Sequence, residues 1–326
     1  MSNDPASLLA HRLASELTTA VPPAVTVLAD MIVGDTRPLG VLFYGSVARG
    51  VDNSDREAVE QALSGVLDFY VIVERHRDWP RPALHRVANT LLPPNVEYHE
   101  KKIGGRVLRA KVAILSLAQF RHLTRKEARD ISIWARFSQP VRLVWVRDTD
   151  AADNILRCVI RSVASASYWA ARLGPEQGTS DIFWRALYAH TYRSELRVEA
   201  PGRERCLLVG QEERCDLMLR SAWQLAGIAG AAEGAVLQTG ISARDYDLAR
   251  KRWRMREKIG RPLNIVRLIK AAFTFQGGAE YLAWKIYRHS GVKVHVTPFM
   301  ERHPLLSAPY VICRLIRAGV FTRCSR

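Results

Sequence analysis

The sequence predicts an α+β fold, in which a mixed β-sheet domain precedes a mostly helical domain. Two observations support this prediction. Short runs of β-branched and aromatic residues, bounded by turn-forming residues, are concentrated before residue 150. From about residue 153 to 290, apolar residues instead recur at helical spacing within Ala-, Leu- and Arg-rich segments. We therefore expect a sheet domain over 1–150, a helical domain over 151–290 and a basic tail over 291–326.

Turn and cap signals separate the elements expected in the sheet domain. Pro22-Pro23 divides a stretch of helical leucine spacing, Gly104-Gly105 favours a hairpin, and Ser116 is placed as a helix N-cap. The expected elements are, in order, one or two helices within 6–33, a strand at 41–44, a helix or inserted loop at 55–64, a strand at 67–74, a helix at 78–92, and strands at 95–100, 106–115 and 141–148. Loops of the helical domain are expected at 173–180, 200–205 and 238–243.

The net charge indicates which classes of partner the protein can bind. The chain has 48 Lys plus Arg against 32 Asp plus Glu, a net charge of +16. A field of this sign attracts polyanions, so nucleic acid, nucleotides and anionic lipid surfaces are the expected partner classes.

The cysteines and the N-terminus indicate the compartment. The five cysteines are scattered without metal-binding or redox spacing, so we expect reduced thiols. No run approaches the ~20 apolar residues that span a bilayer, and the N-terminus lacks a basic segment followed by an apolar core. The sequence therefore predicts a cytoplasmic protein that works where it is made.

The first candidate site residues lie where the strand at 41–44 ends. Gly45 lets backbone amides approach a phosphate closely, and Ser46 can donate its hydroxyl to a phosphate oxygen. Asp68, at the start of the next strand, can hold a Mg²⁺ that bridges phosphates, and Arg49 adds positive charge near the turn. A strand ending in Gly-Ser, followed by an Asp-led strand, is the core pattern of nucleotidyltransferases of the polymerase-β type.

One carboxylate of that pattern is missing. The standard pattern has a second acid two residues after the first, because side chains alternate along a strand, but this position is Tyr70. Glu74 has the right parity, yet six residues along a strand is about 20 Å, too far to share a metal ion. The metal site must therefore be completed from another element, or it is impaired.

Five segments occur in the order seen in the mitochondrial-type phosphatidate cytidylyltransferases, the translocator assembly and maintenance family. They are "FYGSVARG", "LDFYVIVE", "LRAKVAILS", "ISIWARFSQPVRLVW" and "HTYRSELRV". The chain resembles this family over roughly residues 35 to 220. The family also lacks the second strand carboxylate, so the resemblance implies that Tyr70 is compatible with activity.

The resemblance implies roles for the matching residues of the sheet domain. It places Gly45, Ser46 and Asp68 at the nucleotide and the metal. Lys111 matches the strand lysine and Arg136 the arginine before a proline, and both are implied to neutralise phosphate charge.

The helical domain contributes a shorter match. Glu195 and Arg197 correspond to the acid and the arginine of the family's helical motif, and Glu195 is the implied second metal ligand. Several residues depart from the family pattern: Gln139 replaces a lysine, Ser194 a glycine and Glu195 an aspartate, and 22 residues separate Ser46 from Asp68. These departures indicate a distant, bacterial-type relative and leave the substrate open.

Each candidate also has a purely structural interpretation. The structural alternatives are a helix N-cap for Ser46, a turn cap for Asp68, a solvent-facing position for Lys111, a pair with an acid such as Asp130 for Arg136, and a surface pair for Glu195 and Arg197. His99 and His190 lack a ligand spacing and are expected to be structural.

The basic tail contains a predicted amphipathic helix. In "YVICRLIRAGVF", Ile312 and Ile316 fall on one helical face, and Arg314 and Arg317 on another. Such a helix can lie in the interface of an anionic membrane. The alternative is a C-terminal helix docked on the core with a solvated basic face.

The leading functional hypothesis from these residues is a Mg²⁺-dependent phosphatidate cytidylyltransferase, peripheral on the inner face of the membrane. Its implied substrates are CTP and phosphatidate, and no obligatory protein partner is expected. One alternative is nucleotidyl transfer to RNA, to a protein hydroxyl or to a soluble phosphate. The other is an inactive membrane- or nucleic-acid-binding relative.

Overall fold

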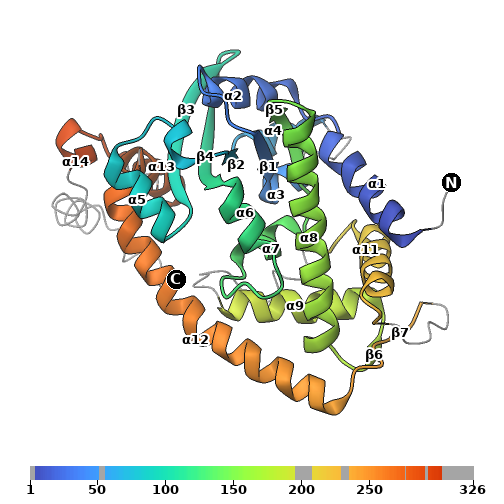
Figure 1. The fold of residues 1–326 in the computed structure, drawn as a ribbon. Helices are drawn as coiled ribbons and strands as arrows, with labels where there is room; N and C mark the ends of the chain where they lie inside the picture. Colours follow the sequence, from blue (N-terminus) through green and yellow to red (C-terminus); the bar gives the residue numbers. More distant parts are fainter. Residues whose placement is uncertain are drawn as a thin grey trace.

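The computed structural model describes residues 4–50, 56–194, 208–228, 235–275, 277–290 and 293–302. Figure 1 shows a central sheet with α1, α8 and α11 to one side and α5, α13 and α14 to the other, while α12 crosses below. The predicted α+β class, with a mixed sheet followed by helices, is confirmed.

The sheet has five strands in the order β3-β4-β2-β1-β5. β2 and β4 are parallel, and the remaining neighbouring pairs are antiparallel. The sheet is mixed because the β3–β4 hairpin folds back, which places β4 beside β2. The strands are β1 (Gly40–Tyr44), β2 (Val66–Val73), β3 (Asn95–Ile103), β4 (Arg106–Ser116) and β5 (Arg142–Val146).

Alternating residues of β2 enter two different cores. Phe69 and Val71 are fully buried in a cluster that includes the apolar face of α2 (Pro23–Val33). Tyr70 and Ile72 point to the opposite face, into a larger cluster shared with α7, α8 and α9. The sheet is therefore covered on both faces, which accounts for its continuous apolar runs.

Helices form the second half of the chain and flank the sheet. The helices around the larger cluster are α1 (Pro5–Thr18), α6 (Leu117–Leu123), α7 (Ser132–Phe137), α8 (Thr149–Leu173), α9 (Ser180–Ser194) and α11 (Glu212–Leu225). The remaining helices are α3 (Gly45–Gly50), α4 (Arg56–Leu63), η1 (His76–Asp78), α5 (Ala83–Leu91), α12 (Ala243–Thr274), α13 (Gly278–Ser290) and α14 (Pro298–Arg302).

The first helix belongs spatially to the helical half. Leu9 and Leu13 of α1 are buried in the larger cluster, and α1 contacts α8 and α11. A buried ion pair joins the same elements: Arg214 Nε on α11 donates to Glu16 Oε1 at 2.7 Å. Arg214 also donates through Nη1 to the carbonyl of Ser138, just after α7, at 3.1 Å. The proposed domain limits stay a prediction.

Most expected elements form, with shifted ends. The expected strand at 67–74 begins at Val66, so Asp68 lies inside β2 rather than at its start. The helix expected at 78–92 begins only at Ala83, because η1 occupies the residues before Trp79-Pro80. Ser116 is the N-cap of α6 as predicted, and its hydroxyl accepts a hydrogen bond from the backbone N–H of Gln119. A two-stranded ladder of β6 (Gln177–Gly178) and β7 (Leu237–Gln238) was not predicted.

In the part of the chain that the structure describes, no single helix is long and apolar enough to cross a membrane. α1 and α2 meet the length and composition criteria only as a pair, and a bend of 87° separates them.

Candidate active site

The glycine turn and the strand carboxylate are direct neighbours. β1 ends at Tyr44, which pairs with Asp68 of β2, and Gly45 turns the chain into α3 with φ of +94°. A Cβ at position 45 would lie 3.0 Å from Asp68 Oδ2. Both the backbone conformation and the close approach of the carboxylate therefore favour glycine at this position.

Ser46 lies in the first turn of α3 and is exposed. It follows the first residue of the helix, so the alternative that it is the N-cap is wrong. Its position beside Gly45 leaves the hydroxyl available to a ligand at this turn, which stays a prediction.

One row across the sheet collects four polar or aromatic side chains. Asp68 pairs with Tyr44 on one side and with Lys111 on the other, and Lys111 pairs with Tyr98. Side chains that are directly opposite on neighbouring strands share a face of the sheet. Lys111 is therefore on the Asp68 face rather than turned away from it, and Asp68 is not a turn cap.

The charges around Asp68 favour an anionic ligand. Burial raises the pKa of the Asp68 carboxyl above its ordinary value, and the positive charges of Lys111 and then Arg136 oppose this rise. These two predicted phosphate-binding cations thus lie within electrostatic reach of the predicted metal ligand. The structure brings Gly45, Asp68, Lys111 and Arg136 together.

Tyr70 explains what replaces the missing carboxylate. Arg136, in the last turn of α7, donates from Nη1 to the Tyr70 hydroxyl at 2.8 Å. The strand position that holds a second acid in the standard pattern therefore holds a guanidinium in place. Asp130, the example of an acid that could pair with Arg136, instead accepts from Arg267 and Ser132.

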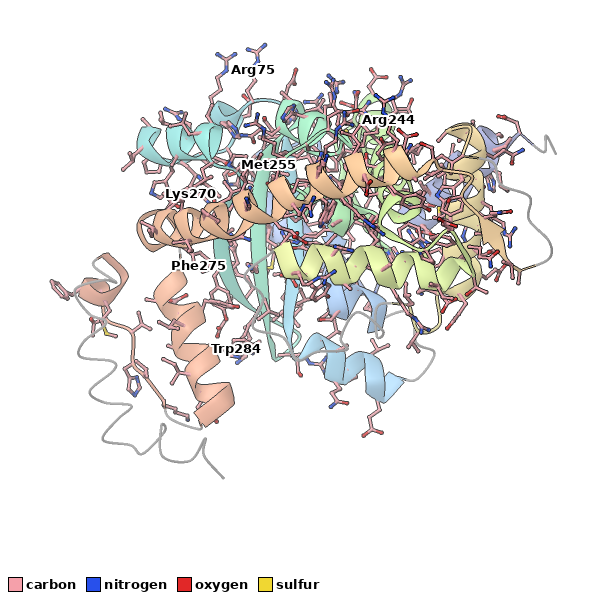
Figure 2. The ribbon with its side chains drawn as sticks, turned by 90° about the horizontal axis from the view of Figure 1, so that it is seen from below. Arg75, Arg244, Met255, Lys270, Phe275 and Trp284 are labelled. Carbon is pink, nitrogen blue, oxygen red and sulfur yellow. The ribbon has the colours of Figure 1, made fainter. Side chains whose placement is uncertain are left out.

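Helix α13 supplies aromatic residues that the sequence did not reveal. The rings of Tyr281 and Tyr98 lie 5.4 Å apart, and Arg109 lies 5.4 Å from the ring centre of Trp284. Burial and then the negative charge of Asp68 raise the pKa of Tyr281, which places this ring near the carboxylate. α13 lies beside the strands, with Trp284 labelled in Figure 2. Of these aromatic residues, only Tyr98 could have been found from the sequence, because the β3–β4 hairpin pairs it with Lys111.

The predicted Mg²⁺ site has one of its two expected ligands, Asp68, among the described residues. Within the described ranges, no group of three or more His, Cys, Asp or Glu side chains could hold a metal ion. Mg²⁺ in nucleotide sites needs one or two carboxylates and completes its shell with phosphate oxygens and water. The half-buried Asp68 carboxylate beside the glycine turn fits that limited role.

Several predicted site residues lie outside the described residues. These are Glu195 and Arg197 of the helical motif and Ile312, Arg314, Ile316 and Arg317 of the tail. Arg49 belongs to α3, but its side chain is outside the description. Their assigned roles stay predictions.

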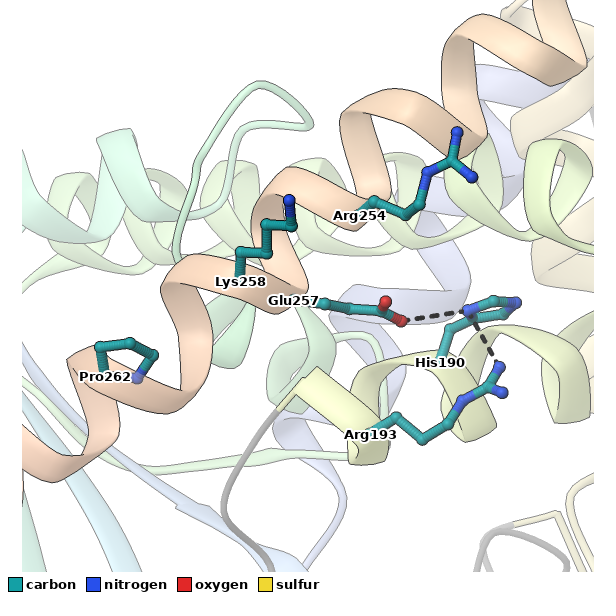
Figure 3. A pocket seen from close by; sticks show the side chains of 6 residues that line it. All are labelled: His190, Arg193, Arg254, Glu257, Lys258 and Pro262. Atoms are coloured by element: carbon teal, nitrogen blue, oxygen red, sulfur yellow. Dashed lines mark hydrogen bonds and ion pairs between the residues drawn. The ribbon is translucent and has the colours of Figure 1, made fainter.

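A pocket of about 560 Å³ lies between α9 and α12, away from the Gly45 turn. Figure 3 shows His190 between Glu257 and Arg193, with Nδ1 3.6 Å from Glu257 Oε1 and 3.1 Å from Arg193 Nη2. Burial and then the charge of Arg193 lower the pKa of His190, and the contact with Glu257 opposes this shift. His99 contacts the buried Glu97 at 3.1 Å. These contacts favour the structural interpretation of both histidines.

Comparisons with known proteins add little. No protein-family model matches the chain, and no curated protein matches it in sequence. A solved structure of a nucleotidyltransferase-like protein from Exiguobacterium sibiricum aligns with 13% identity over 91% of each chain. Its TM-score is 0.24, so this likeness supports no conclusion about this protein.

Proposed function

We propose that this protein is a nucleotidyltransferase, and specifically that it transfers CMP from CTP to phosphatidate and releases pyrophosphate. The observation that supports the general class is the close approach of Asp68 to Gly45, with Lys111 and Arg136 beside the carboxylate. The lipid acceptor and the cytosine base are taken from the family resemblance alone.

The proposed roles follow from charge and position. The Gly45 turn receives the β- and γ-phosphates through its backbone, with the Ser46 hydroxyl as a further donor. Lys111 and Arg136 neutralise the leaving pyrophosphate or the incoming lipid phosphate. Asp68 would hold the Mg²⁺ that accompanies CTP. When bound, this metal ion would neutralise negative charge on the phosphates.

The reaction needs little from a catalytic base. An oxygen of the lipid phosphomonoester attacks the α-phosphorus of CTP and forms a new P–O bond, while the bond to the β-phosphate oxygen breaks and pyrophosphate leaves. The attacking oxygen of a phosphomonoester is already largely deprotonated at neutral pH. The chain therefore has to position two anions and offset their repulsion, which suits a site with one carboxylate and two cations.

The test follows pyrophosphate release from purified protein with Mg²⁺, phosphatidate in mixed micelles, and each of the four nucleoside triphosphates in turn. We expect release with CTP only, dependent on phosphatidate and abolished by Asp68→Asn. Asp153→Asn, at an exposed position of α8, is the matched control and should retain activity.

Other outcomes select between the alternatives. Release with a soluble phosphate or RNA acceptor, but not with phosphatidate, keeps the class and rejects the lipid. If no acceptor supports pyrophosphate release and no nucleotide binds, the enzyme hypothesis is rejected and an inactive binding protein is favoured.

A further inference from the structure

Helix α5 exposes an apolar stripe. Leu84, Val87 and Leu91 are 69%, 55% and 78% exposed, and their spacing of three and four residues places them on one face of the helix. Side chains of this size are normally exposed singly in soluble proteins, so a stripe of three on one short helix indicates a contact surface.

The neighbouring helix α12 exposes a second stripe. Ile265, Val266 and Ile269 are 49%, 51% and 56% exposed in its C-terminal half. The opposite face of α12 is buried and carries Trp253 and Arg256. The C-terminal half of this helix therefore exposes its apolar side, whereas Arg254 and Lys258 nearer the N-terminus are exposed at the rim of the pocket beside α9.

The stripe on α12 changes from apolar to basic along the helix. Counting back from Ile269 in helical steps of three or four residues, the exposed face continues through Ile265, Pro262, Lys258, Arg254 and Lys251. The whole helix contains ten basic residues and three acidic ones. One helix face thus presents cations next to apolar side chains.

Polar contacts hold the two helices together. Lys270 Nζ on α12 donates to the carbonyls of Leu92 and Pro94, each at 2.6 Å, and Arg267 Nε donates to the carbonyl of Pro93 at 2.9 Å. These carbonyls directly follow α5. Figures 1 and 2 both place α5 beside the C-terminal half of α12. The two stripes therefore lie on neighbouring helices in one part of the molecule.

We propose that this region docks on an anionic lipid bilayer. The α5–α12 surface is defined by Leu84, Val87, Leu91, Ile265, Val266 and Ile269. Its apolar side chains enter the boundary between head groups and acyl chains, and Lys251, Arg254 and Lys258 contact the lipid phosphates. The combination of apolar and basic residues on one helix face, with a net protein charge of +16, selects an anionic membrane over a neutral one.

This docking surface is separate from the predicted tail helix and does not depend on the proposed reaction. It would orient the protein on the bilayer even if the acceptor were soluble. Conversely, the proposed transfer could act on a dispersed lipid without it. The two proposals can fail independently.

The test is flotation of the full-length protein, without nucleotide, on phosphatidylcholine vesicles with and without phosphatidylglycerol. We expect binding only to the anionic vesicles, reduced by added salt. Leu91→Glu combined with Ile269→Glu should weaken this binding at least tenfold. The tail is unchanged in these variants, so any contribution from it is constant.

Matched controls use apolar residues that are exposed elsewhere. Val209→Glu and Leu225→Glu change side chains that are 74% and 50% exposed, one just before α11 and one at its end, and α11 lies across the molecule from α5 (Figure 1). They should retain wild-type binding, and circular dichroism melting should show that all variants fold. The proposal would be overturned if the wild-type protein did not bind anionic vesicles, or if the Leu91→Glu and Ile269→Glu variant bound them as well as the controls do. It would also be overturned if these substitutions changed only the oligomeric state, from dimer to monomer.

Discussion

Gly45 and Asp68 touch across the β1–β2 pair: a Cβ on Gly45 would lie 3.0 Å from Asp68 Oδ2. The turn that is proposed to hold phosphates and the carboxylate that is proposed to hold their metal are therefore a single packed unit. A change at either residue moves the other, which makes the pair a sensitive test of the site.

Gly45→Ala should disable the site by two mechanisms. The φ of +94° is strained for alanine, at a cost of about 1–2 kcal/mol, and the new methyl group displaces the Asp68 carboxylate. Gly105→Ala is the matched control, because its φ is +79° and a Cβ there meets nothing within 4 Å. Both variants should lose stability in urea titrations, but only Gly45→Ala should lose nucleotide binding in calorimetry. Equal binding by the two variants would show that the contact with Asp68 is irrelevant.

Asp68→Asn should stabilise the protein at neutral pH in the absence of nucleotide and metal. Burial raises the pKa of Asp68 in the folded state, so the folded protein loses stability as the pH rises from the ordinary value of 3.8 through the raised pKa. Asparagine cannot ionise and avoids this loss. The melting temperature of the variant should exceed that of the wild type at neutral pH, and the gap should close near pH 3.8. A variant that melts below the wild type at neutral pH would contradict the sign of this argument.

Tyr70→Phe should loosen Arg136. The substitution keeps the ring, which packs 5.1 Å from Phe137, and removes the acceptor of the 2.8 Å hydrogen bond. A hydrogen bond to a charged group contributes about 1.5–3 kcal/mol, so a loss of about 2 kcal/mol in unfolding free energy is expected, with weaker nucleotide binding. Tyr168→Phe is the control, since Arg172 contacts the ring of Tyr168 at 3.6 Å. If Tyr70→Phe matches this control in stability and affinity, Arg136 is held by other contacts.

Glu97 should contribute stability that is lost in acid. Burial alone would raise its pKa, but hydrogen bonds from His99, Arg81 and Trp79 outweigh burial and lower the pKa to about 2. The contribution is complete above the ordinary pKa of 4.5 and disappears as the pH falls towards 2. Denaturant titrations of the wild type and Glu97→Gln across this range should converge at the acid end.

The partner of Glu97 gives a second prediction. Arg81→Met removes the guanidinium from the buried Glu97 carboxylate, which then keeps only its contacts with His99 and Trp79, at a cost of about 3 kcal/mol in unfolding free energy. Arg77→Met removes an exposed arginine that lies 4.0 Å from Asp78, and should cost less than about 1 kcal/mol. Equal effects of the two substitutions would show that burial of the pair is unimportant.

The sequence was informative where local patterns decide the structure. The strands on either side of Gly45, the β3–β4 hairpin and the Ser116 cap follow from apolar runs, paired glycines and a capping residue. The same patterns brought Asp68 and Lys111 to one region, because strand alternation fixes which side chains share a face.

The rest depends on contacts between residues far apart in the chain. No local signal indicates that Arg136 reaches Tyr70, 66 positions earlier, or that Tyr281 of α13 returns to Asp68. The exposure of Leu84 and Leu91 was also unpredictable, because an apolar stripe on a helix ordinarily indicates burial. These features depend on which elements pack together in the folded protein, and the local sequence does not reveal this.

The packing of α1 has a consequence for synthesis on the ribosome. The first helix buries Leu9 and Leu13 against α8 and α11, and Glu16 pairs with Arg214, so the last of its partners is made about 200 residues later. The sheet can form as soon as β5 emerges, but the N-terminal helix then still lacks the surface it covers. Burial of the N-terminal helix is thus a late step of folding, and a nascent chain arrested before α11 should show protease cleavage within residues 5–18 while the sheet is already protected.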